Sequence, residues 1–98
     1  MMTDERSAKI TIGGQEYELI LTTKATKEIA KRYGGLSNLG EKLMKSENFE
    51  MALDEVVWLI TLLANQSVLV HNLQNPAKKQ DLLTQDAVEL LTSPLELS

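Results

Sequence analysis

The sequence contains no cysteine and a single histidine, His71, among its 98 residues. Without thiols the chain cannot form disulfide bonds, a zinc site built on cysteine thiolates or a cysteine nucleophile. One histidine cannot supply a set of imidazole ligands, and we interpret His71 as a side chain that hydrogen-bonds free carbonyls at the end of a helix. The composition therefore predicts no catalytic residue, no metal site and no cofactor, and argues against an enzyme.

Long apolar runs and an excess of positive charge are also missing. The acidic N-terminus is not followed by the apolar stretch of a signal peptide. The longest apolar run, Val56 to Ala64, is interrupted by Thr61, whereas a membrane span needs about 20 residues. Ten basic and fourteen acidic residues give a net charge of −4. Such a chain is a poor general ligand for nucleic acid or anionic membranes, so we expect neither as a partner and expect a cytosolic protein.

The first structured segment is predicted to be an antiparallel β-hairpin over residues 8–21, after a flexible tail at residues 1–7. Gly13-Gly14 suits a two-residue turn, which needs positive φ angles and sets the register of the strands. The expected pairs are Ile12–Gln15, Thr11–Glu16, Ile10–Tyr17, Lys9–Glu18 and Ala8–Leu19. One face then collects the apolar side chains Ala8, Ile10, Ile12, Tyr17, Leu19 and Leu21, and on the other Lys9 is expected to pair with Glu18.

Residues 23–71 are predicted to form a helical core. Thr23 is expected to cap a first helix that ends at Gly34-Gly35 with a left-handed residue. A second helix is expected over 38–45, behind Ser37, and a third after the N-cap Asn48.

The third helix is apolar nearly all round. One stripe is formed by Phe49, Leu53, Val56, Ile60 and Leu63, and most of the remaining surface by Val57, Trp58, Leu59 and Leu62. A helix of this kind must be buried on all sides, and so small a domain has little with which to bury it. We therefore expect part of this surface to contact another chain, with Trp58 and Leu62 as interface anchors; the alternative is that both side chains belong to the core alone.

The C-terminal part is predicted as a loop over 72–82 and a helix over 84–92 that is capped by its first residue. Leu83 and Val88 are placed for a hydrophobic staple at the start of that helix. Residues 93–98 repeat a helix start signal and predict a truncated helix. Overall we expect an α+β fold, in which an N-terminal two-stranded antiparallel hairpin packs on a mostly helical bundle of about four helices within a single domain, 8–98.

Charge is unevenly distributed along the chain. Six basic and two acidic residues lie between Lys24 and Lys45, whereas four acidic residues and no basic one lie between Glu47 and Glu55. This asymmetry is typical of a solvated surface, or of head-to-tail self-association between a basic and an acidic patch. The acidic pairs Asp54/Glu55 and Asp86/Glu89 are explained by helix dipoles rather than by acid–base chemistry. The candidate partner-binding residues are Trp58, Leu62, Lys24, Lys27, Lys31, Arg32, Glu50 and Asp54.

The order of these segments resembles the tail assembly chaperones of long-tailed bacteriophages and prophages. The resemblance covers IxIGGxxYxL at 10–19, YGG at 33–35, LSNLGEKL at 36–43, FExALDExxWLxxLLANQ at 49–66 and LTxxxVELLTSP at 83–94. It implies a non-enzymatic morphogenesis factor in the host bacterial cytoplasm, absent from the mature virion. Such a protein forms homo-oligomers, coats the tape-measure protein and promotes polymerisation of the tail-tube protein. Short forms in the family usually continue into a further helix, whereas this chain stops at Ser98.

Two alternatives belong to other classes. A ubiquitin-like adaptor shares the opening hairpin and helix, but it needs further strands, and the sequence after Leu36 has only helical patterns. A small helix-turn-helix regulator needs a basic recognition helix. The basic helix here is followed at once by Gly34-Gly35.

Overall fold

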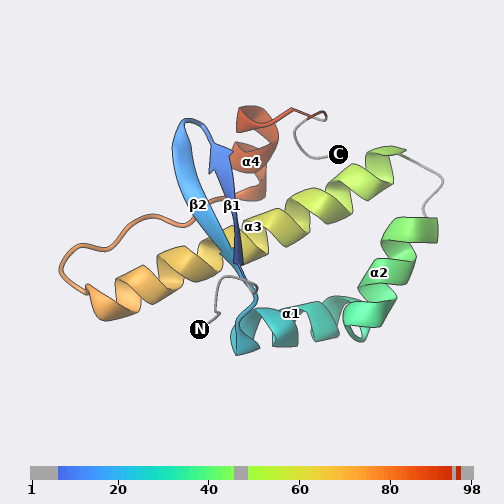
Figure 1. The fold of residues 1–98 in the computed structure, drawn as a ribbon, viewed down its shortest axis with the longest axis horizontal. Helices are drawn as coiled ribbons and strands as arrows, with labels where there is room; N and C mark the ends of the chain where they lie inside the picture. Colours follow the sequence, from blue (N-terminus) through green and yellow to red (C-terminus); the bar gives the residue numbers. More distant parts are fainter. Residues whose placement is uncertain (1–6, 46–48, 94, 96–98) are drawn as a thin grey trace.

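The computed structural model describes residues 7–45, 49–93 and 95, and it is an α+β structure that confirms the predicted fold class. A two-stranded hairpin precedes the helices. Helix α3 runs along the length of the molecule, the hairpin crosses it, and α1 and α2 lie on the side opposite α4 (Figure 1). The elements are β1 (Ser7–Ile12), β2 (Gln15–Ile20), α1 (Thr23–Tyr33), α2 (Leu36–Lys45), α3 (Phe49–Gln74) and α4 (Gln85–Leu91).

The hairpin has the register that its turn predicts. All five predicted pairs are observed, and Gly13 and Gly14 have φ angles of 62° and 82°. Lys9 lies opposite Glu18, as predicted, but its ion pair is with another residue. The amino group of Lys9 lies 3.9 Å from Glu16 instead, because a long side chain reaches a diagonal neighbour as easily as a direct one.

Helix α1 begins one residue earlier than predicted, because its N-cap is Thr22 and not Thr23. Thr22 has an extended backbone, and its hydroxyl accepts a hydrogen bond from the N–H of Ala25 at 3.0 Å. The same hydroxyl donates to the side-chain oxygen of Gln66 on α3, which attaches the start of α1 to the long helix. The predicted stop is confirmed: Gly34 has a φ of 89°, and its N–H donates to the carbonyl of Ala30 at 2.8 Å.

The second and third helices are both longer than predicted. Helix α2 starts at Leu36, and α3 continues three residues beyond His71. The backbone N–H and side-chain amide of Asn75 donate to the carbonyl of His71 and close α3, so the role predicted for His71 is wrong. Its Nε2 donates instead to the carbonyl of Lys78 in the following loop, at 2.9 Å. The predicted N-cap Asn48 lies outside the described residues.

The core lies where the hairpin and α4 meet α3. Ile12, Val57 and Val88, each at most 4 % exposed, form its centre. Four half-buried side chains pack around them: Ile10, Tyr17, Ile60 and Leu83. The small residues Val57, Thr61, Ala64 and Val68 form a buried line along α3, each at most 8 % exposed. In the stripe that the sequence contains, Leu53, Val56, Ile60 and Leu63 are half-buried, and the side chain of Phe49 lies outside the described part.

Helix α4 confirms the predicted start. Thr84 caps it by accepting a hydrogen bond from the N–H of Ala87 at 3.1 Å, and Leu83 packs against the cluster that contains Val88. The helix ends at Leu91, one residue before the predicted end. The predicted start of another helix at 93–98 lies largely outside the described residues.

Candidate functional site

Much of the apolar surface of α3 is not covered by the chain itself. The segment Leu53–Gln74 has a mean hydropathy of 1.4, and 28 % of this apolar stretch is buried. By length and composition it could cross a membrane, although core helices of soluble proteins satisfy the same criteria. Val70 and Leu73 on its C-terminal half are 39 % and 83 % exposed. The surplus apolar surface that the sequence predicts is therefore present in the folded chain.

A groove on α3 contains both predicted interface anchors. Trp58 and Leu62 lie in it with Leu69, and Lys24 of α1 lies at its edge. Its volume is about 340 Å³, which is in the range of ligand and peptide pockets. We call this the Trp58 groove. It is lined by Lys24, Glu28, Trp58, Thr61, Leu62, Asn65, Gln66, Leu69, Leu82 and Gln85.

The polar side chains at the base of the groove bond within the fold. The hydroxyl of Thr61 donates to the carbonyl of Val57 at 2.7 Å, and the amide of Gln66 donates to the carbonyl of Leu62 at 3.1 Å. Asn65 forms two hydrogen bonds with the backbone of Leu83, at 2.7 and 2.9 Å. Within the described residues, every buried side-chain nitrogen or oxygen has a partner. What the groove offers to a ligand is therefore mainly apolar surface.

The basic residues beside the groove are only partly neutralised. Lys24, Lys27 and Lys31 line an adjoining hollow of about 310 Å³ on α1. Lys31 lies 3.7 Å from Glu28 in an exposed ion pair. Lys24 and Lys27 are exposed, and no carboxylate in the described part of the chain lies within ion-pair distance of either. We call these two side chains the lysine rim.

Arg32 does not belong to this free basic surface, which corrects its grouping with the three lysines. Its guanidinium lies 3.5 Å from the carboxylate of Glu55, and its Nε donates to the hydroxyl of Tyr33 at 2.9 Å. That hydroxyl donates in turn to Glu55. Lys42 of α2 approaches the same carboxylate at 3.6 Å. The Glu55 network, Arg32, Tyr33, Lys42 and Glu55, thus joins α1 and α2 to α3.

The carboxylate at the centre of this network is held in its charged form. Burial raises the pKa of Glu55, whose side chain is 11 % exposed. The hydrogen bond from Tyr33 and the charges of Arg32 and Lys42 outweigh burial, so the pKa lies below its ordinary value. Burial and the bond to Glu55 raise the pKa of the Tyr33 phenol. The network is therefore a charged unit at neutral pH.

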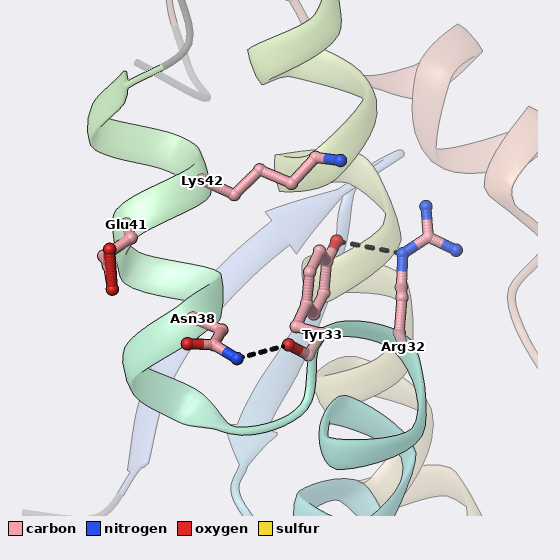
Figure 2. Close-up of a pocket in the computed structure, with 5 residues that line it drawn as sticks. All are labelled: Arg32, Tyr33, Asn38, Glu41 and Lys42. Carbon is pink, nitrogen blue, oxygen red and sulfur yellow. Dashed lines mark hydrogen bonds between the residues drawn. The ribbon is translucent and has the colours of Figure 1, made fainter.

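The cavity beside this network is lined by side chains from α1 and α2 (Figure 2). Asn38 donates to the carbonyl of Tyr33 at 2.8 Å, and Lys42 extends from α2 across the cavity. The volume is about 460 Å³. Because Arg32 and Lys42 are both paired with Glu55, this cavity has little free positive charge with which to attract an anion.

Trp58 lies between the network and the groove. Its ring packs edge-to-face against Tyr33, with centroids 5.6 Å apart, and the guanidinium of Arg32 lies 4.6 Å from its centroid. The same half-buried residue also lines the groove. Trp58 is therefore positioned by the fold and remains accessible, which is the arrangement expected of an interface anchor.

The structure brings together some of the predicted residues and separates others. Trp58, Leu62 and Lys24 line one groove, with Lys27 and Lys31 beside it. Asp54 is exposed on α3 and does not line the groove, whereas Glu50 is in α3 with its side chain outside the described part.

Sequence reasoning missed the role of Glu55, which was explained by the helix dipole. A signal was present: Glu55 precedes Trp58 by three residues, so it shares the apolar face of the helix. A charge on such a face needs a partner.

The described side chains contain no cluster of three or more histidine, cysteine, aspartate or glutamate residues that could hold a metal ion. The chemistry that the arrangement does offer is recognition: an apolar groove with two free ammonium groups at one edge. Comparison with protein-family models, with curated proteins and with solved structures finds no match to this chain.

Proposed function

We propose that this chain is a non-enzymatic tail assembly chaperone of a long-tailed bacteriophage or prophage, which oligomerises and coats the tape-measure protein during tail-tube assembly. The observation that carries the proposal is the Trp58 groove on a long helix whose apolar surface is only partly covered. A protein that shields a long apolar partner needs such a surface in its free state. The tape-measure protein is proposed as the partner because the order of the sequence segments resembles that of tail assembly chaperones.

The groove accounts for how a small chain could bind a long helix. An amphipathic helix recognised in a groove places side chains at i, i+3, i+4 and i+7 into apolar pockets. One groove of this size gives a modest affinity. Many copies along one partner increase the overall affinity through effective concentration, without any new kind of contact.

The two alternative functions lack the features that they need. A ubiquitin-like adaptor requires a sheet of four or five strands, whereas the sheet formed by the described residues has two. A helix-turn-helix regulator would use the basic face of α1, from which Arg32 turns inward to Glu55. Neither alternative gains support from a specific observation.

The test is co-expression with the tape-measure protein encoded by the same phage or prophage genome, with its soluble fraction as the readout. We expect the wild-type chain to raise that fraction severalfold. Leu62→Asp, which introduces a charge into the groove, should remove the effect. Leu73→Asp is the matched control, because it makes the same change on the same helix at an 83 % exposed position outside the groove. A tape-measure protein that stays insoluble with the wild-type chain would overturn the proposal.

A further inference from the structure

A second surface of the chain is also left without a partner. On α4, Val88 is fully buried, whereas Asp86, Glu89 and Leu90 are spaced i, i+3, i+4 and lie on the opposite, exposed side. Leu90 is 83 % exposed. Neither carboxylate has an ion-pair partner within the described residues. We call Asp86, Glu89 and Leu90 the outer face of α4.

The outer face of α4 is complementary to the Trp58 groove and the lysine rim in apolar surface and in charge. The groove presents apolar side chains, including Trp58 and Leu62, and Leu90 is an apolar side chain exposed on α4. The lysine rim carries two free positive charges three residues apart on α1, and the outer face carries two free negative charges three residues apart on α4. Two helices can therefore bring both pairs together in one arrangement.

We propose that the outer face of α4 in one copy of this chain docks into the Trp58 groove of a second copy, with Leu90 beside Trp58 and Leu62, and with Asp86 and Glu89 facing Lys24 and Lys27. This inference rests on the proposed function and names the contact by which the chaperone self-associates. The two surfaces are unlike, so the contact is heterologous and repeats from copy to copy. The contact occupies the same groove that the proposed function assigns to the tape-measure protein, so self-association and binding of the tape-measure protein compete for it.

Among the described side chains, α4 is a better acidic partner than the segment Glu47–Glu55 that the charge pattern indicates. Glu55 is already paired with Arg32 and Lys42 inside its own chain. Its neighbour Asp54 is the only exposed carboxylate among the described side chains of that segment. By contrast, α4 offers two carboxylates and an uncovered leucine on the same face.

Light scattering coupled to size exclusion, over a concentration series at low salt, tests the contact. The wild-type mass should rise with concentration above the 10.9 kDa of one chain, beyond that of a dimer. The reversals Lys24→Glu with Lys27→Glu, or Asp86→Lys with Glu89→Lys, should each raise the dissociation constant at least about tenfold, because like charges then face each other. Combining all four changes should restore association. Lys78→Glu with Lys79→Glu, exposed loop positions, is the matched control and should behave as wild type.

Mixing tests whether the contact joins unlike surfaces. Leu62→Asp introduces a charge into the groove, and Leu90→Asp introduces a charge into the outer face. Each variant by itself should therefore be monomeric. Together they should form a 1:1 complex, because one intact groove and one intact outer face remain. Circular dichroism of each variant verifies that it is folded. A wild-type chain that stays monomeric, a four-fold variant that fails to associate, or a mixture that stays monomeric would overturn the contact.

The outcome can be separated from that of the proposed function. A monomeric wild-type chain that still keeps the tape-measure protein soluble overturns this contact and the oligomerisation in the proposed function, but it leaves binding of the tape-measure protein standing. The contact is supported if association is lost in each charge-reversed pair and restored in the four-fold variant. If the tape-measure protein nevertheless stays insoluble with the wild-type chain, the proposed function is overturned.

Discussion

The Glu55 network and the Trp58 groove occupy neighbouring stretches of α3, and they use their polar groups in opposite ways. In the network, two cations and a phenol from α1 and α2 converge on one buried carboxylate. In the groove, polar side chains bond to the backbone of the chain, and apolar side chains are left open. The difference separates internal stability from recognition: the first region holds the helices together, and the second is available to a partner.

The largest expected effect comes from removing the centre of the network. Glu55→Ala leaves Arg32, Lys42 and Tyr33 without their shared partner, and should lower the free energy of unfolding by about 3 kcal/mol. The melting temperature should fall by at least about 12 °C. Thermal and urea unfolding, followed by circular dichroism, measure both. The control Asp54→Ala, one residue away and exposed, should cost less than about 0.5 kcal/mol. Equal losses in the two variants would contradict the assignment of Glu55 as the link between the helices.

Acid should weaken the network by a smaller amount. Because the pKa of Glu55 is lower in the folded chain than in the unfolded chain, its contribution is present above about pH 4.3, the ordinary value for glutamate. That contribution is lost as the pH falls through the folded pKa. Urea unfolding between pH 7 and pH 3 should show a steeper fall in stability for the wild type than for Glu55→Gln, which has no carboxyl group to protonate. Parallel curves would show that Glu55 does not carry this pH dependence.

The smallest effect compares two basic residues on the same helix. Arg32→Gln breaks the contacts with Glu55, Tyr33 and Trp58 and should cost about 1 kcal/mol, a value reduced by the 42 % exposure of its side chain. Lys27→Gln should change monomer stability by less than about 0.5 kcal/mol. Urea unfolding at a concentration where light scattering detects only the monomer measures each loss. If Lys27→Gln were as costly as Arg32→Gln, the division between internal and outward-facing charges on α1 would be wrong.

Features that depend on neighbouring residues were predictable from the sequence. Gly13-Gly14 determined the turn, and with it the five strand pairs. Gly34 determined the end of α1, and Thr84 determined the start of α4. The excess apolar surface of α3 was also predictable, because it follows from the residue types around the helix. Trp58 and Leu62 could therefore be chosen as interface candidates before their surroundings were known.

Features that join distant segments were decided by the tertiary structure. Thr22 caps α1 in place of Thr23 where it also bonds to Gln66, 44 residues away. Glu55 and Arg32 looked like surface charges because each was considered with its own helix, and only packing places them together. The small residues Val57 and Ala64 are buried more deeply than larger neighbours, because distant segments pack there, as Ile12 of β1 and Val88 of α4 do against Val57. Local sequence determined turns, caps and residue types, and the approach of distant segments decided which charges are paired and which surface stays open.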